Sequence, residues 1–81
     1  MSLNKFEIPS DNELRLTYSL PKSRKATIAL LFIPNTRQIA EAHLVDSDID
    51  IDIQELVGVH SACNDVPGLL RAILARLRAE I

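Results

Sequence analysis

The sequence predicts an α+β fold: an antiparallel sheet of three to four strands, followed by two C-terminal helices that pack on one face of it. Up to about Val45, apolar residues alternate with polar ones or run continuously, which is typical of strands. From Ile53 onward, apolar residues recur three and four positions apart, which is typical of amphipathic helices. In a chain of 81 residues, strands first and helices last indicate one small α+β domain.

The strand-like part of the sequence divides into segments joined by short connections. A short first strand is expected from Lys5 to Ile8, and clean alternation predicts a second from Glu13 to Leu20. The third, from Ala26 to Ile33, is apolar at almost every position, which is typical of a central strand. A weaker strand covers about Ile39 to Val45. Because the connections are short, we expect an antiparallel meander.

Capping residues and apolar spacing predict two helices after the sheet. Asp52 is a candidate N-cap of the first helix, with Glu55 completing a box-like cap. Residues that share the apolar face of this helix are Ile53, Leu56, Val57 and His60. Asn64-Asp65 would cap the second helix, and Pro67 falls in its first turn, where the missing N–H is harmless. Its wide apolar stripe consists of Val66, Leu69, Leu70, Ile73, Leu74, Leu77 and Ile81.

Charge and composition argue against nucleic-acid binding, an internal disulfide and insertion in a membrane. A net charge of −2 provides no general attraction to nucleic acid or to an anionic membrane. Cys63 is the single cysteine, which excludes an internal disulfide and fits a reducing compartment. The longest apolar run, Ile28 to Ile33, is too short to cross a bilayer, and the N-terminus does not resemble a signal peptide. We therefore expect a soluble, intracellular domain that is not held in a membrane.

Acidic residues at alternate positions raise the question of a calcium site. They are Asp46, Asp48, Asp50 and Asp52. In the EF-hand pattern, a glycine and a bidentate glutamate are also required, and those positions hold isoleucine and valine here. A solvated loop that leads into the helix caps explains the aspartates better, and we expect no metal and no cofactor.

The candidate residues for nucleophilic catalysis are His60, Cys63 and Asp65, which are close in sequence. A thiolate nucleophile needs a base and an orienting group placed around it in space. Zinc needs about four ligands, and His43 is the only further histidine. We favour a structural role for Cys63 as a small buried hydrophobe, and we expect no catalytic residues. The alternative is a small thiol-dependent enzyme or ligand-binding domain that uses His60 and Cys63.

Basic residues occur in two places. Lys22, Arg24 and Lys25 form a basic loop, and Arg71 and Arg78 align on the outer face of the last helix. The sequence shows neither a glycine-rich loop nor a recognised nucleic-acid motif beside these charges. A solvated face that aids solubility is the favoured interpretation, and we expect no direct contact with nucleic acid. A nucleic-acid binder that uses Arg71, Arg78 and the basic loop is the third option, after the interaction module and the thiol-dependent domain.

Apolar surface is the strongest functional signal in the sequence. Two helices can cover one face of the sheet, while Thr27, Ala29, Leu31 and Ile33 lie on the other face of the third strand. That face is either a second layer of core or a docking surface. Phe6 and Ile8 share one face of the first strand, which is expected to be an edge. The residues proposed for protein binding are therefore Phe6, Ile8, Leu31 and Ile33.

The segment from Asp11 to Ser19, an apolar strand through Leu30 to Phe32 and two C-terminal helices together resemble an RWD domain. More narrowly, they resemble the last RWD domain of the kinetochore-null (blinkin) family of outer-kinetochore scaffolds. Positions that match its strand motif are Asn12, Glu13, Leu14, Arg15 and Leu16. The resemblance covers the chain from about Asn4 to Ile81. RWD domains usually begin with a helix before the sheet, and this sequence predicts none there.

This resemblance implies a single RWD-like domain over residues 1–81, from the C-terminal part of a longer chain. It implies a non-catalytic protein-interaction module of a scaffold that acts in chromosome segregation during cell division. The implied location is the nucleus, at the kinetochore that assembles on the centromere. The implied partners are an adjacent RWD domain and a subunit of the MIND complex.

Overall fold

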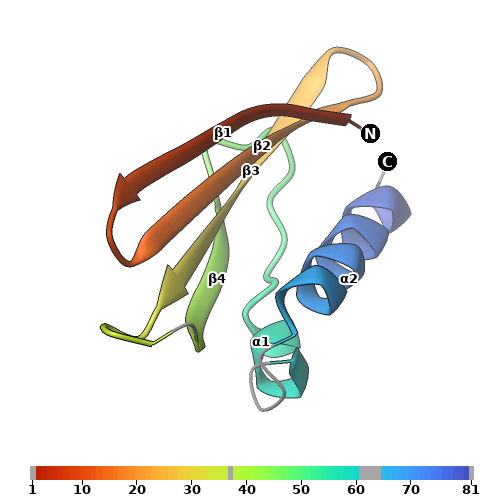
Figure 1. Cartoon of the computed structure of the whole chain (residues 1–81). Helices are drawn as coiled ribbons and strands as arrows, with labels where there is room; N and C mark the ends of the chain where they lie inside the picture. The colour runs from red at the N-terminus through yellow and green to blue at the C-terminus, as the bar shows by residue number, and fades with distance from the viewer. Residues whose placement is uncertain (1, 37, 61–64, 81) are drawn as a thin grey trace.

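A computed structural model describes residues 2–36, 38–60 and 65–80, with the backbone alone at positions 59 and 60. The elements follow one another in the order shown in Figure 1. They are β1 (Ser2–Ser10), β2 (Glu13–Leu20), β3 (Arg24–Phe32), β4 (Ile39–Val45), α1 (Glu55–His60) and α2 (Val66–Ala79). Four antiparallel strands followed by two helices confirm the α+β class that the sequence predicts.

Neighbouring strands are consecutive in the chain, so the sheet is a simple meander in the order β1-β2-β3-β4. The bounds of β2 and β4 agree with the prediction. Strand β3 begins two residues earlier than expected, at Arg24, because Lys22 and Ser23 adopt positive φ values of 64° and 59° and close a short turn. Strand β1 is longer than expected and includes Pro9, which an edge strand tolerates because one of its sides needs no N–H donors.

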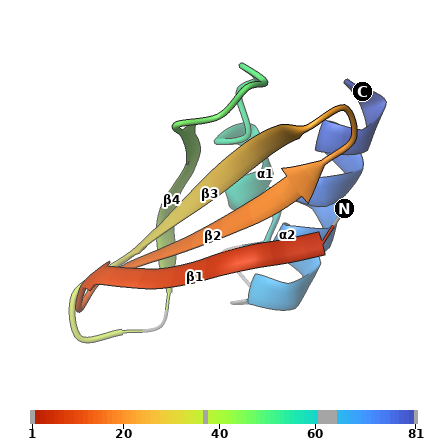
Figure 2. The same cartoon turned by 90° about the horizontal axis from the view of Figure 1, so that it is seen from above.

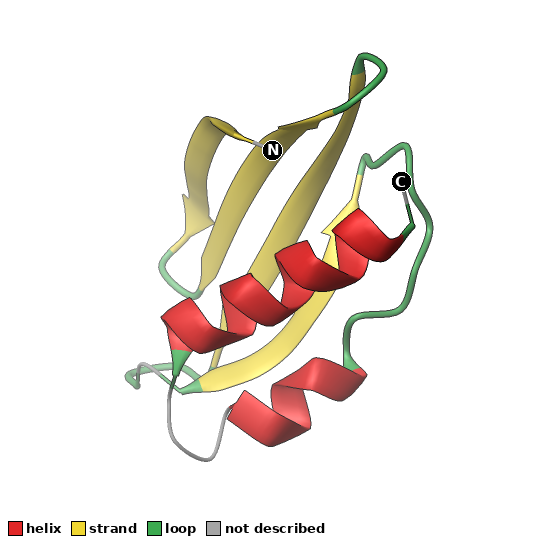
Figure 3. Cartoon of the chain, turned by 90° about the vertical axis from the view of Figure 1, so that its right-hand side faces the viewer, coloured by secondary structure: helices red, strands yellow, loops and turns green. Residues whose placement is uncertain are grey.

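The two helices lie on one face of the sheet, as Figures 2 and 3 show. Register places the apolar residues of neighbouring strands opposite one another on that face, for example Leu14 opposite Leu30. The apolar stripe of α2 packs onto them. The largest fully buried side chains are Ile28, Leu30, Ile53, Leu69, Ile73 and Leu77. The core is therefore a single layer between the sheet and the helices.

Acidic side chains at the start of each helix accept hydrogen bonds from backbone N–H groups. Asp65 accepts a hydrogen bond from Gly68 N at 2.9 Å, which confirms the predicted N-cap of α2. Asp52 accepts from Gln54 N at 2.9 Å, so it stabilises the turn that leads into α1. Glu55 does not complete a box there, because its carboxylate pairs with the guanidinium of Arg76 on α2. That ion pair joins the two helices.

Candidate functional site

Strand β1 is exposed along its whole length: each of its nine residues is exposed. It is an edge strand, and on its outer side the described part of the chain provides no neighbouring strand. The other edge strand, β4, is used differently, because Ala42 N donates to Oε1 of Gln54 at 3.0 Å. An unoccupied edge presents N–H and C=O groups to any extended segment that approaches it. The edge at β1 is thus the more open of the two.

Three large apolar side chains stand out from β1. Leu3 is 52% exposed, Phe6 is 57% exposed and Ile8 is 64% exposed. We call these three residues the β1 strip. Single exposed apolar residues are ordinary on a protein surface, whereas three on one short strand form a patch.

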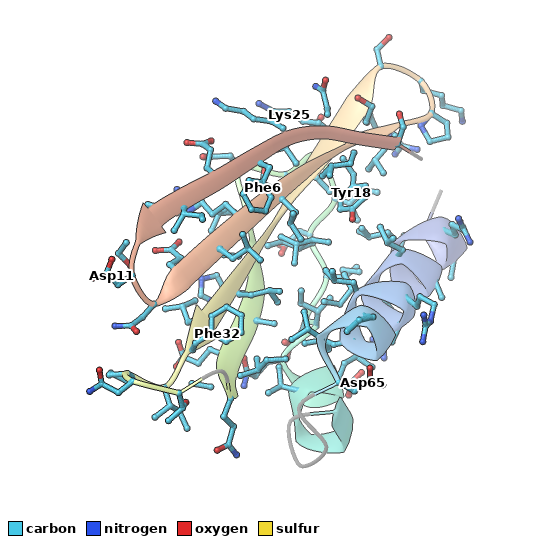
Figure 4. The ribbon with its side chains drawn as sticks, viewed as in Figure 1. Phe6, Asp11, Tyr18, Lys25, Phe32 and Asp65 are labelled. Carbon is cyan, nitrogen blue, oxygen red and sulfur yellow. The ribbon has the colours of Figure 1, made fainter. Side chains whose placement is uncertain are left out.

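Leu3 and Phe6 of the β1 strip lie on the face of the sheet that carries the helices. Leu3 is opposite Tyr18 and Phe6 is opposite Leu16, both of which point toward the helices. A register shift between Leu3 and Lys5 adds one residue to β1, which brings Leu3 and Phe6 onto the same face although they are three apart. Figure 4 shows Phe6 and Tyr18 on the α2 side of the sheet and Lys25 on the other side.

The position of α2 explains why the β1 strip is uncovered. Arg76 reaches Glu55 on α1, and α1 packs against β4, so this flank of α2 faces away from β1. Leu70 and Leu74 lie on the opposite flank at helical spacing, and both are only half-buried. Figure 3 shows α1 and the strand β1, near the N-terminus, on opposite sides of α2. The half-buried flank of α2 is therefore the one turned away from α1.

The opposite face of the sheet is polar over much of its area, which differs from the apolar face that the sequence predicts. Ala29 is fully buried, because register places the longer side chains of Arg15 and His43 on either side of it. Leu31 is half-buried and Ile33 is 40% exposed, and at the other end of this face the half-buried Val45 of β4 lies opposite Thr27. The four residues proposed for protein binding therefore divide between two faces.

Charged and neutral polar side chains line a depression of about 250 Å³ on that opposite face. The lining residues are Asn4, Lys5, Glu7, Arg15, Thr17, Lys25, Thr27 and Asp46. Arg15 Nε donates to Glu13 Oε2 at 2.6 Å, and this hydrogen bond, with the charge of the carboxylate, raises the pKa of Arg15 above its ordinary value. The guanidinium therefore remains charged, and Glu13 already holds it.

The thiol hypothesis rests on His60 and Cys63. Cys63 lies outside the described residues, as does the side chain of His60. Asp65 is engaged as a helix cap, and His43 is exposed on β4. Among the residues that the structure describes, no three His, Cys, Asp or Glu side chains gather where they could hold a metal ion. The thiol hypothesis therefore stays a prediction.

Two of the aspartates before α1, Asp48 and Asp52, accept hydrogen bonds from backbone N–H groups. Asp48 Oδ2 accepts from Lys25 N at 2.8 Å, and Asp48 N donates to Lys25 O at 3.0 Å. Together these two hydrogen bonds anchor the loop to the start of β3. Arg71 and Arg78 are exposed on α2, as expected of a solvated face.

The β1 strip contains one residue that sequence reasoning missed. Leu3 lies outside the strand predicted from Lys5, because the bulge interrupts the alternation by which strands are recognised. The sequence also does not distinguish the half-buried flank of α2 from the buried face, because Leu70 and Leu74 belong to one continuous apolar stripe.

No protein-family model matches this chain, and no curated protein and no solved structure matches it either. In the part of the chain that the structure describes, neither helix has both the length and the apolar character needed to span a bilayer.

Proposed function

We propose that this chain is a non-catalytic protein-interaction module that binds its partner along β1. The observation that carries the proposal is an edge strand exposed at all nine residues, with Leu3, Phe6 and Ile8 each more than half exposed and with Leu3 and Phe6 on one face. Unpaired backbone groups and a contiguous apolar strip are the two features that strand addition requires.

In this mode, an extended segment of the partner lies beside β1 and continues the sheet. Backbone hydrogen bonds provide directional attraction, and alternate side chains of the added strand contact the β1 strip. Phe6 is the expected anchor because it is aromatic and lies in the middle of the strand. Leu70 and Leu74 are half-buried on the flank of α2 that is turned away from α1.

The resemblance to the kinetochore-null family supplies the partners to be tested. They are an adjacent RWD domain and the MIND complex, in a scaffold for chromosome segregation in the nucleus. Leu31 and Ile33 form a second proposed contact on the opposite face. The polar depression and the half-burial of Leu31 make that contact the smaller of the two.

Two variants on opposite faces test this proposal. Phe6→Glu places a charge in the β1 strip, and Ile33→Glu makes the matched change on the other face at an exposed position. Binding to purified MIND complex and to the neighbouring RWD domain is measured by titration calorimetry, with circular dichroism confirming that each variant folds. We expect Phe6→Glu to weaken binding by at least about tenfold, which corresponds to about 1.4 kcal/mol.

Ile33→Glu is expected to change the affinity by no more than about threefold, which is under about 0.7 kcal/mol. Weakening by Ile33→Glu alone would transfer the site to the opposite face. No binding by the wild type, or equal binding by all three folded proteins, would refute the proposal.

A further inference from the structure

The centre of β1 has a symmetric charge pattern. Lys5 and Glu7 stand one residue either side of Phe6, and both point to the polar face of the sheet. Lys5 Nζ lies 3.2 Å from Glu7 Oε1, and both side chains are at least half exposed. Phe6 points to the opposite, helix-bearing face. Opposite charges at equal distances from a central residue favour antiparallel pairing of two identical strands about that residue.

The register of such pairing can be decided from charge. A twofold axis at Lys5 would set two lysines opposite each other, and an axis at Glu7 would set two glutamates opposite each other. An axis at Phe6 places Lys5 of each copy opposite Glu7 of the other copy. Directly opposite residues in an antiparallel pair attract when their charges differ and repel when they are alike. Of these three central registers, the one at Phe6 is therefore favoured.

The same register also suits the apolar side chains. Pairing about Phe6 sets the two Phe6 rings opposite each other on the helix-bearing face, where aromatic cross-strand pairs are favourable. Both helix layers then lie on the same side of the joined sheet. The two β1 strips meet in one continuous apolar patch, which buries part of each.

We infer that β1 is a self-association edge: two copies of this chain pair through β1, antiparallel, with the twofold axis at Phe6. This inference rests on the proposed function, since it names a second copy as a partner of the same edge. Register shifts flank the regular pairing of β1 with β2 from Lys5 to Glu7, and such irregularities limit how far an edge can pair. The dimer is therefore weak and concentration-dependent.

Charge reversal tests the inference without disturbing the core. Lys5→Glu sets two pairs of carboxylates against each other across the axis, and Glu7→Lys sets two pairs of ammonium groups. The wild type is expected to shift from monomer to dimer in sedimentation velocity across about two orders of magnitude in protein concentration. Each single variant should weaken association by at least about tenfold.

Two further samples separate register-specific pairing from general stickiness. The double variant Lys5→Glu/Glu7→Lys restores opposite charges across the axis and should dimerise like the wild type. An equimolar mixture of the two single variants should form a heterodimer, because each introduced charge then meets its opposite. Circular dichroism and thermal melts are expected to match for all samples.

Each outcome decides the inference. A wild type that stays monomeric at all concentrations overturns it. A dimer that neither single reversal weakens, or that the mixture and the double variant do not restore, overturns the pairing about Phe6. In either case the proposed function stands if Phe6→Glu still weakens binding to the MIND complex or to the neighbouring RWD domain. It falls separately if that variant leaves binding unchanged.

Discussion

The start of α2 depends on Asp65 and Gly68, because the Asp65 carboxylate lies where a side chain at position 68 would be. Asp65 Oδ1 accepts a hydrogen bond from Gly68 N at 2.9 Å and so satisfies one of the free N–H groups of the first turn. A Cβ added at Gly68 would lie 2.0 Å from Asp65 Oδ2 and 2.6 Å from its Cγ. Alanine at position 68 must therefore displace the carboxylate that caps the helix.

These contacts predict that substitutions at the two positions are not additive. Asp65→Ala should lower the free energy of unfolding by about 1 kcal/mol, the typical value of an N-cap. Gly68→Ala should gain up to about 1 kcal/mol from helix propensity, but only where the carboxylate is absent. In the wild-type background, loss of the cap offsets that gain and leaves a net change within about 0.5 kcal/mol. The expected coupling is about 1 kcal/mol.

A double-mutant cycle measured by urea unfolding and far-ultraviolet circular dichroism checks this prediction. The four proteins are the wild type, the two single variants and the double variant. In a domain of this size, about 1 kcal/mol moves the Tm by roughly 4–8 °C, so thermal melts provide a second readout. Additivity within about 0.3 kcal/mol would refute the reasoning, because it would mean that the carboxylate can move aside without losing a stabilising bond.

Two other predictions follow from burial and charge. Ile73→Ala should lower the free energy of unfolding by about 2–5 kcal/mol, because Ile73 is fully buried between α2 and the sheet, and Leu70→Ala should lower it less, because Leu70 is half-buried. Equal losses in urea titrations would contradict the proposed position of α2. Glu55→Gln removes the exposed ion pair with Arg76 and should cost less than about 1 kcal/mol, with the difference from the wild type shrinking in about 1 M salt. A larger, salt-independent loss would show that Glu55 acts through something other than this pair.

The local sequence pattern was sufficient to predict an element wherever one periodicity or one capping motif held along the whole segment. Strand β2 was predicted with its observed bounds because polar and apolar residues alternate from Glu13 to Leu20 without interruption. The N-cap at Asp65 followed from the residue type and from Pro67 two positions later. In both cases the physics is local, since a few neighbouring residues in the chain decide the backbone conformation.

Local pattern was insufficient where a neighbouring strand decides the environment. The face of β3 that carries Ala29 and Leu31 looked apolar in isolation. Strand pairing brings Arg15 from β2 and His43 from β4 beside Ala29, and the resulting face is largely polar. Single-strand periodicity cannot report this, because the side chains that cover Ala29 come from elsewhere in the chain.

The amino-acid sequence by itself determined the α+β fold class, the order of strands and helices and the stripe of α2 that enters the core. These features depend on spacing and capping, which a chain expresses before it folds. Only the tertiary structure decided that β1 is the open edge, that a bulge turns Leu3 and Phe6 onto one face, and that α2 leaves the β1 strip uncovered. The physical reason is that exposure is a property of the whole packing, set by which surfaces the helices reach and which they do not.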